Sequence, residues 1–102
     1  MTDILEDIQL DEKLKDKIEE PSKYKVVLLN DDKTPMEWVI GLLIEIFKHD
    51  NNTAQQLTLT IHNEGSGVAG IYSYEVAETK LNEATTLSRN QGFPLALQLE
   101  KE

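Results

Sequence analysis

The segment from Pro35 to Lys48 predicts a helix that is apolar around almost its whole circumference. With residues placed 100° apart, the polar positions Glu37, Gly41, Glu45 and Lys48 fall within a stripe about 80° wide. A helix on the surface of a globular domain needs a much narrower apolar face. A chain of 102 residues forms one modest core, so this helix must be buried on most sides and also expose apolar surface to a partner.

Charge and cysteine content narrow the possible chemistry. The formal net charge of −9 disfavours duplex nucleic acid and anionic membranes as partners, and fits a cationic group better. The absence of cysteine excludes disulfides, thiolate metal ligands and a cysteine nucleophile. No segment approaches the ~20 apolar residues of a membrane span, and the acidic start does not resemble a secretory signal.

Residues 1–20 differ from the rest in composition. They contain eight acidic residues and three lysines, which contribute −5 to the net charge, and no aromatic residue. We expect a flexible acidic N-terminal extension at 1–20 and a core domain at 21–102. The alternative is a tail that only improves solubility.

The other periodicities predict further strands and a second clear helix. Strand-forming residues dominate 23–29 and 68–74, and 93–99 alternates at its end. Ser73 is placed to cap a helix that ends at Asn90. Its predicted inward face consists of Ala77, Leu81, Ala84 and Leu87.

The segment 53–62 fits two structures. From Leu57 to His62 it alternates like a strand, whereas Leu57, Thr58 and Ile61 also share one face of a helix that Asn52 could cap. Short connections between all these elements predict an α+β fold, in which a small antiparallel sheet carries the helices on one face.

The turn from Asn30 to Met36 joins the first strand to the apolar helix. Asn and Asp side chains bond nearby backbone amides in turns, and Thr34-Pro35 predicts an N-cap followed by proline at the first helical position. One such residue is enough to build a turn, so the run Asn30-Asp31-Asp32 indicates a further role. That these residues only build the turn remains the alternative.

Several kinds of site are poorly supported. No ligand spacing supports a metal site from Asp31, Asp32 and His62, and no nucleophile supports a hydrolase that uses Asp32 and His62. A lone histidine is also commonly structural. By contrast, an Asn carbonyl, an Asp carboxylate and a neutral His nitrogen are all acceptors, which suits an ammonium group with three N–H donors. An apolar wall beside such acceptors describes a site for the N-terminal residue of a polypeptide.

The sequence resembles the ClpS family over about residues 21–101. The motifs are Pro21 to Asp32, Thr34-Pro35-Met36-Glu37, Glu75-Val76-Ala77-Glu78-Thr79-Lys80, Pro94-Leu95 and Leu99-Glu100-Lys101. Members are bacterial adaptors of the N-degron pathway. The resemblance implies that 53–62 is helical and that a three-stranded antiparallel sheet packs against three helices in the order β-α-α-β-α-β.

What the resemblance implies for function is specific. The protein would bind the free α-amino group of proteins that begin with Leu, Phe, Tyr or Trp, and deliver them to the ClpA unfoldase of the ClpAP protease. We expect a cytoplasmic monomer without catalytic activity, cofactor or metal. Its partners would be N-degron substrates and the ClpA N-domain, not nucleic acid or membrane. An assembly domain that resembles the ribosomal stalk C-terminal domain is the alternative.

The resemblance also assigns residues by position. Asn30, Asp32 and His62 would hold the α-amino group, and Asp31 would help to position the peptide. The hydrophobic pocket would be lined by Thr34, Met36, Val39, Leu42, Thr58, Ile61 and Leu95. Unfoldase docking would use Glu75, Glu78 and Lys80, and the acidic extension would engage the unfoldase during delivery. Thr58 departs from the methionine that is common in the family, which predicts a pocket more permissive of β-branched residues. Lys33, often aromatic in the family, Gly41 and Asn63 also depart.

Overall fold

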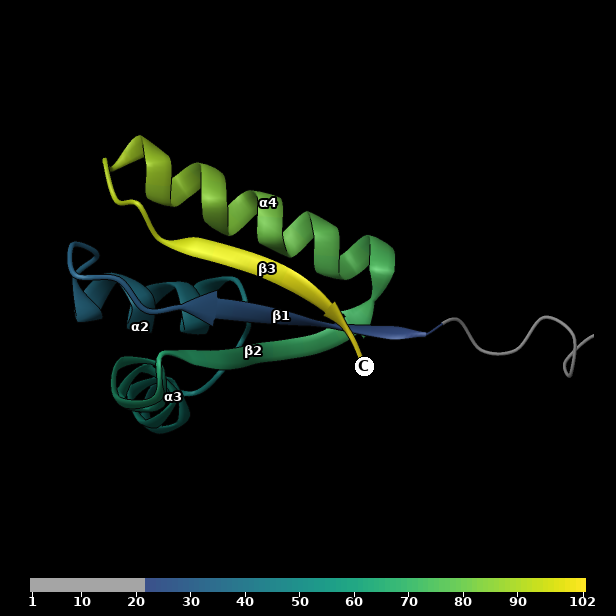
Figure 1. Ribbon diagram of the computed structural model, residues 1–102, viewed down its shortest axis with the longest axis horizontal. Coiled ribbons are helices and arrows are strands. Elements are labelled where there is room, and N and C mark those ends of the chain that lie inside the picture. Colours follow the sequence, from purple (N-terminus) through teal and green to yellow (C-terminus); the bar gives the residue numbers. More distant parts are fainter. Residues whose placement is uncertain (1–21) are drawn as a thin grey trace, which may run out of the picture.

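The computed structural model describes residues 22–102, so the predicted extension at 1–20 lies outside the described residues. The elements are β1 (Lys23–Leu29), α2 (Met36–Glu45), α3 (Asn51–Glu64), β2 (Ser66–Ser73), α4 (Tyr74–Asn90) and β3 (Ala96–Lys101). The segment whose pattern fitted two structures is therefore helical. The predicted α+β class and the order β-α-α-β-α-β are confirmed (Figure 1).

The sheet is antiparallel throughout, with strand order β2-β1-β3. The apolar strand β1 takes the central position, where both of its edges are paired. Val26 opposes Gly70 and Val27 opposes Val68, which leaves Ala69 as the extra residue of a β-bulge. A Cβ atom on Gly70 would collide with the outer end of the Tyr72 side chain, so glycine beside the bulge leaves room for this ring.

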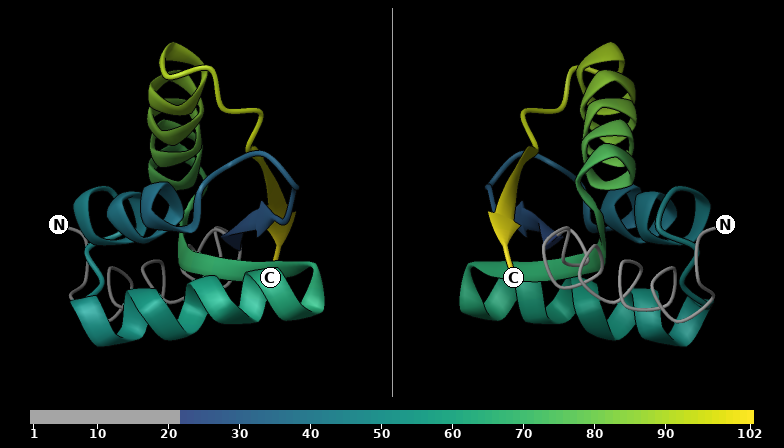
Figure 2. Two further views of the ribbon diagram at one scale, coloured as in Figure 1. Left: turned by 90° about the vertical axis from the view of Figure 1, so that its left-hand side faces the viewer. Right: turned by 90° about the vertical axis from the view of Figure 1, so that its right-hand side faces the viewer.

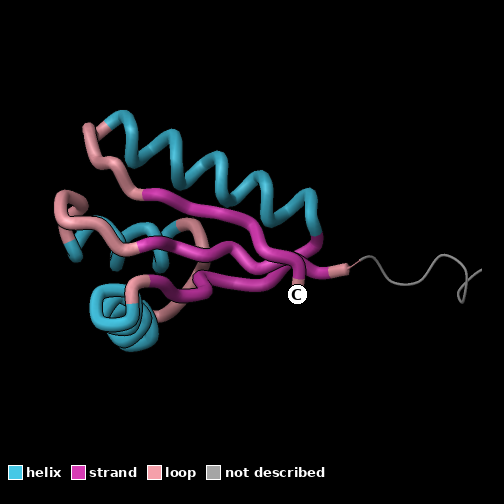
Figure 3. Tube along the Cα trace, viewed as in Figure 1, coloured by secondary structure: helices cyan, strands magenta, loops and turns pink. Residues whose placement is uncertain are grey.

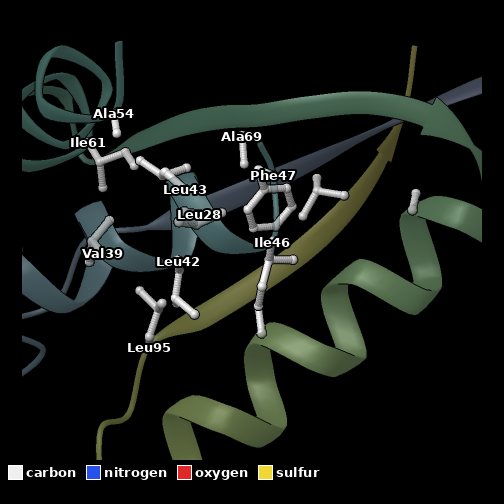
Figure 4. Close-up of a cluster of buried hydrophobic side chains, with 13 residues drawn as sticks. Leu28, Val39, Leu42, Leu43, Ile46, Phe47, Ala54, Ile61, Ala69 and Leu95 are labelled. Atoms are coloured by element: carbon white, nitrogen blue, oxygen red, sulfur yellow. The ribbon is translucent and has the colours of Figure 1, made fainter. Parts of the chain in front are cut away.

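The core lies between one face of the sheet and the three helices. Val26 and Leu28 point into it from β1, and α2 contributes the largest share of the buried side chains in Figure 4. This burial accounts for most of the apolar circumference of α2. Met36, at the start of the helix, remains 39% exposed. The prediction of a largely buried helix with some exposed apolar surface is confirmed.

The start of α2 differs from the sequence prediction. The helix begins at Met36, and Pro35 occupies the N-cap position without a side-chain capping bond. Thr34 does not cap the helix, because its hydroxyl donates to Asp31 Oδ2 at 2.8 Å. The helix ends at Glu45 instead of Lys48, and Lys48 has a left-handed φ of 62°. The chain therefore turns toward α3 one helical turn earlier than hydrophobicity alone indicates.

Other boundaries also shift. Asp50, not Asn52, caps α3, by accepting a hydrogen bond from the Thr53 amide at 2.7 Å. Ser73 occupies the N-cap position of α4 without a capping bond, and β3 begins at Ala96, three residues later than predicted. The inward prediction for Leu87 is wrong, because this residue is 42% exposed while Ser88 is fully buried. The small Ser88 hydroxyl is satisfied within α4 by donating to the Ala84 carbonyl.

The domain has two ends, separated by the length of β1. The turn after β1, the end of α3 and the loop between α4 and β3 gather at one end (Figures 1 and 3), which faces the viewer in the left half of Figure 2. At the other end, Lys23 pairs with Ser73, and the Tyr24 ring packs edge-on against Tyr74 with centroids 5.1 Å apart. At about 3.4 Å per residue, β1 holds the two ends about 20 Å apart.

Candidate functional site

A cavity of about 300 Å³ opens where the turn after β1, the start of α2 and the last turns of α3 meet. Its lining residues are Asn30, Asp31, Asp32, Thr34, Met36, Val39, Thr58, Ile61 and His62. The structure thus brings together all four polar residues that the sequence proposed for the α-amino group and the peptide. It also brings together five of the seven residues proposed for the hydrophobic pocket.

The turn after β1 is held by the Asp31 carboxylate. Asp31 Oδ1 accepts hydrogen bonds from the Lys33 amide at 2.8 Å and the Thr34 amide at 2.7 Å, and Oδ2 accepts the Thr34 hydroxyl. Desolvation raises the pKa of Asp31, but these three bonds, aided by the positive charge of Arg89, outweigh it and lower the pKa below its ordinary value. The Asp31 carboxylate is therefore occupied by its own turn.

The three proposed ammonium acceptors lie at the exposed mouth of the cavity. Asn30, Asp32 and His62 are all exposed. The backbone N–H of Asn30 donates to the Gly65 carbonyl at 2.9 Å. This bond ties the turn to the C-terminus of α3, one helical turn beyond His62. Gly65 permits this junction because it has a φ of 93°, a conformation that favours glycine. The fold therefore places acceptors from two segments around one opening.

The deeper part of the cavity is apolar. Val39 and Ile61 are buried, and Thr58 is 3% exposed. The Thr58 hydroxyl donates to the Ala54 carbonyl at 2.7 Å, so its one O–H donor is already used within α3. Thr58 can therefore offer a ligand its methyl group or the acceptor side of its hydroxyl, but no hydrogen-bond donor. A polar mouth above an apolar floor is an arrangement that binds a charged group with a hydrophobic side chain attached.

Two proposed pocket residues lie behind this cavity. Leu42 is 4% exposed and packs in the core. Leu95 lines a smaller adjoining space of about 20 Å³, together with Leu29 and five residues that are shared with the main cavity. Sequence reasoning missed Leu29, whose only signal was its place directly before Asn30.

A second concave surface lies along α4 at the other end of the domain. We call it the α4 groove; it measures about 310 Å³ and is lined by Glu75, Val76, Thr79, Lys80 and Glu83. Of the three proposed docking residues, Glu75 and Lys80 line it. The third, Glu78, accepts the Tyr74 hydroxyl at 2.8 Å, and this bond raises the pKa of Tyr74. Among the other lining residues, Thr79 and Glu83 follow Glu75 at helical spacing, which is a signal that the sequence did contain.

Lys80 also has a partner within the domain. Its ammonium group donates to the Ile46 carbonyl at 2.7 Å, at the C-terminus of α2, and lies 5.3 Å from the centre of the Tyr72 ring. A cation here satisfies an unpaired carbonyl at a helix C-terminus. Lys80 therefore joins the α4 groove to the helix that lines the main cavity.

Within residues 22–102, no group of three His, Asp or Glu side chains is arranged to hold a metal ion. No helix in this part of the chain is long and apolar enough to cross a membrane.

Comparison with known proteins identifies the family. Residues 19–98 match the family model described as ATP-dependent Clp protease adaptor protein ClpS. ATP-dependent Clp protease adapter proteins ClpS of Burkholderia thailandensis and Burkholderia cenocepacia are each 47% identical over 90 residues, which cover 88% of this chain and 86% of the relatives. The structure of Agrobacterium tumefaciens ClpS2 bound to L-phenylalaninamide superimposes with a TM-score of 0.79 at 42% identity, over 81% of this chain and 100% of that one. The chain therefore belongs to the ClpS family of non-catalytic adaptors of the ATP-dependent Clp protease.

Proposed function

We propose that this adaptor binds proteins whose first residue is Leu, Phe, Tyr or Trp, and that it recognises their free α-amino group. Asn30, Asp32 and His62 would accept hydrogen bonds from the ammonium group, and the buried floor of the cavity would receive the side chain. The single observation that supports this function best is the cavity itself, where exposed acceptors surround the entrance to an apolar space.

The ligand of a relative agrees with this proposal. L-phenylalaninamide, which is bound to the Agrobacterium tumefaciens protein, consists of a free α-amino group, an aromatic side chain and an amide in place of the next peptide bond. These are the parts of an N-terminal phenylalanine. Family membership favours the adaptor over the assembly domain and the small hydrolase that the sequence left as alternatives.

A pair of peptides tests the recognition step. A fluorescent peptide that begins with Phe should bind, and its N-acetylated twin should not, because acetylation removes both the positive charge and two of the three donors. The free α-amino group has a pKa near ~8 and is mostly charged at pH 7. Fluorescence anisotropy measures both affinities, and equal binding of the two peptides would contradict the proposal.

For delivery, we propose that the α4 groove docks the N-domain of ClpA through Glu75 and Lys80, with Glu78 nearby. The groove offers charges of both signs beside the exposed Val76, a combination suited to a protein surface. The chain enters β1 at the same end of the domain, because Lys23 pairs with Ser73 at the start of α4. The acidic residues at 1–20, which precede β1 in the sequence, would then engage the unfoldase during delivery.

Removing residues 1–17 tests the role of the extension. Peptide affinity should be unchanged, because no residue of the cavity is lost, whereas degradation of an N-degron substrate by ClpAP should be impaired. The matched control is an extension of the same length and charge with its order scrambled. Normal degradation by the truncated adaptor would leave the extension as a solubilising tail.

A further inference from the structure

The last turn of α4 contacts helix α2, which contributes to the peptide cavity, and the segment 93–95, which ends at the small adjoining space. Ser88 accepts a hydrogen bond from Trp38 Nε1 of α2 at 2.9 Å. Arg89, the next residue, donates from Nη1 to the Phe93 and Leu95 carbonyls, each at 2.8 Å. Neither Ser88 nor Arg89 lines the cavity, and no part of the proposed recognition uses them.

The segment held by Arg89 ends at the back of the binding space. Leu95 is 1% exposed and lies at the edge of the core beside Val39 and Leu42 (Figure 4). It closes the small space of about 20 Å³ that adjoins the main cavity and shares Thr34, Val39 and Ile61 with it. The position of the Leu95 side chain therefore sets how far this space extends beyond the main cavity.

The backbone between α4 and β3 has no regular hydrogen bonding of its own to hold it in place, so the bonds from Arg89 restrain it. Gly92 has a φ of 80°, and the segment up to Leu95 belongs to neither a helix nor a strand. The Phe93 amide is bonded to Ser88, but the carbonyls of Phe93 and Leu95 point to Arg89. Bonds from a guanidinium to carbonyls are charge-assisted and stronger than neutral ones.

We propose that Arg89 is a positioning residue for the peptide cavity: by holding the 93–95 segment, it fixes Leu95 as the far wall and so favours first residues long enough to reach it. This inference rests on the proposed binding of N-terminal residues. An aromatic first residue reaches from the main cavity toward the small space of about 20 Å³ beside Leu95, whereas valine ends short of it. Arg89 thus affects how strongly the adaptor selects long side chains over short ones, without touching the ligand.

The ratio of two affinities tests this role. The Kd values of peptides that begin with Phe and with Val, otherwise identical, are measured by competition anisotropy for the natural protein and for Arg89→Met. In Arg89→Met we expect the ratio of the Kd for the Val peptide to the Kd for the Phe peptide to fall about five- to tenfold. A fall of this size corresponds to the loss of about one methylene group of contact in the pocket. A loss of folded protein, or a changed attraction for the ammonium group, alters both affinities equally and leaves the ratio unchanged.

Two further variants complete the experiment. Arg89→Lys keeps the charge and offers several N–H donors on one nitrogen, but on a shorter side chain, so it should restore part of the preference. Lys25→Met removes one positive charge from the sheet face opposite the core and should leave the ratio unchanged. A natural ratio in Arg89→Met would overturn the inference. Should Arg89→Met not fold, Arg89→Ala, which also lacks a donor to the 93–95 segment, takes its place, and a natural ratio there would overturn it. Failure of the natural protein to bind the Phe peptide would instead contradict the proposed function.

Discussion

The peptide cavity and the α4 groove are built in different ways. The cavity combines a turn, the start of one helix and the end of another, whereas the groove lies along the surface of a single helix. Residues of the cavity depend on hydrogen bonds that hold separate segments together, such as the bond from the Asn30 amide to Gly65. Most residues of the groove depend only on the integrity of α4. A substitution in the groove should therefore change docking directly. A substitution at the cavity often changes peptide affinity indirectly, by releasing a segment that positions other residues.

The largest effect is expected at Asp32, the exposed carboxylate of the mouth. Asp32→Ala should reduce affinity for a Phe-initiated peptide by about ten- to a hundredfold, because a hydrogen bond to a charged group contributes roughly 1.5–3 kcal/mol. His62→Ala should reduce it less, since an imidazole nitrogen accepts a hydrogen bond without the full negative charge of a carboxylate. Circular dichroism should show an unchanged fold, and an unfolded Asp32→Ala protein would make the residue structural.

A smaller loss of affinity, here for the ClpA N-domain, is expected from substitutions in the α4 groove. Lys80 differs from the other groove residues because it also bonds to the C-terminus of α2. Glu75→Lys should weaken binding of the ClpA N-domain about tenfold, equivalent to 1.4 kcal/mol, with peptide affinity unchanged. Lys80→Glu should weaken docking as well, but it also removes the donor to Ile46. It should therefore lower the free energy of unfolding by about 1 kcal/mol, which urea denaturation measures. Equal stability of the two variants would show that the Lys80 contact contributes nothing.

The same contrast explains what the sequence could predict. The strands, the apolar helix α2 and the charged surface of α4 follow from periodicity and composition, because each depends on one element. The acceptors Asn30 and Asp32 were also accessible, because they adjoin a strand end. By contrast, the assignment of Leu95 to the pocket rests only on the family resemblance, because no local pattern shows that its segment, where the Leu95 carbonyl accepts from Arg89, lies beside the cavity. Likewise, the bond from Trp38 to Ser88 joins residues 50 positions apart, which no local pattern reveals.

A third test concerns Asp31, whose carboxylate holds the turn and is not free at the mouth of the cavity. It asks whether this residue acts on stability and binding through the turn. Its pKa is lowered in the folded protein, so its contribution to stability is present above the unfolded pKa and is lost as the pH falls through the folded value. Asp31→Asn keeps an oxygen that accepts the Lys33 and Thr34 amides but carries no charge. The difference in free energy of unfolding between natural protein and variant should therefore shrink below about pH 4.

Peptide affinity separates this role from direct contact. If Asp31 acts through its turn, Asp31→Asn should bind a Phe-initiated peptide nearly as well as the natural protein, and Asp31→Ala should bind clearly less well. Direct ion pairing with the ammonium group would make the two variants equally poor. Asp50, whose pKa is lowered first of all by the Thr53 amide, titrates in the same acidic range but lies outside the cavity, so Asp50→Asn is the matched control.

The smallest expected effect concerns the shape of the cavity at Thr58. A methionine at this buried position would fill space beside Ile61 and crowd a substrate side chain branched at Cβ, whereas Leu and Phe would avoid it. Threonine has a shorter side chain than methionine, and its hydroxyl is bonded to Ala54, so it leaves more of this space open. The ratio of affinities for Leu- and Ile-initiated peptides should therefore be several-fold lower in the natural protein than in Thr58→Met. One methyl or methylene is worth only ~1–3 kcal/mol in such a pocket, so a single side chain decides the ratio.

Leu59→Met adds the same side chain at the next position, which is 52% exposed, and should leave the ratio unchanged. An equal ratio in Thr58→Met would mean that another side chain, such as the adaptable Met36 across the cavity, limits the branched substrates instead.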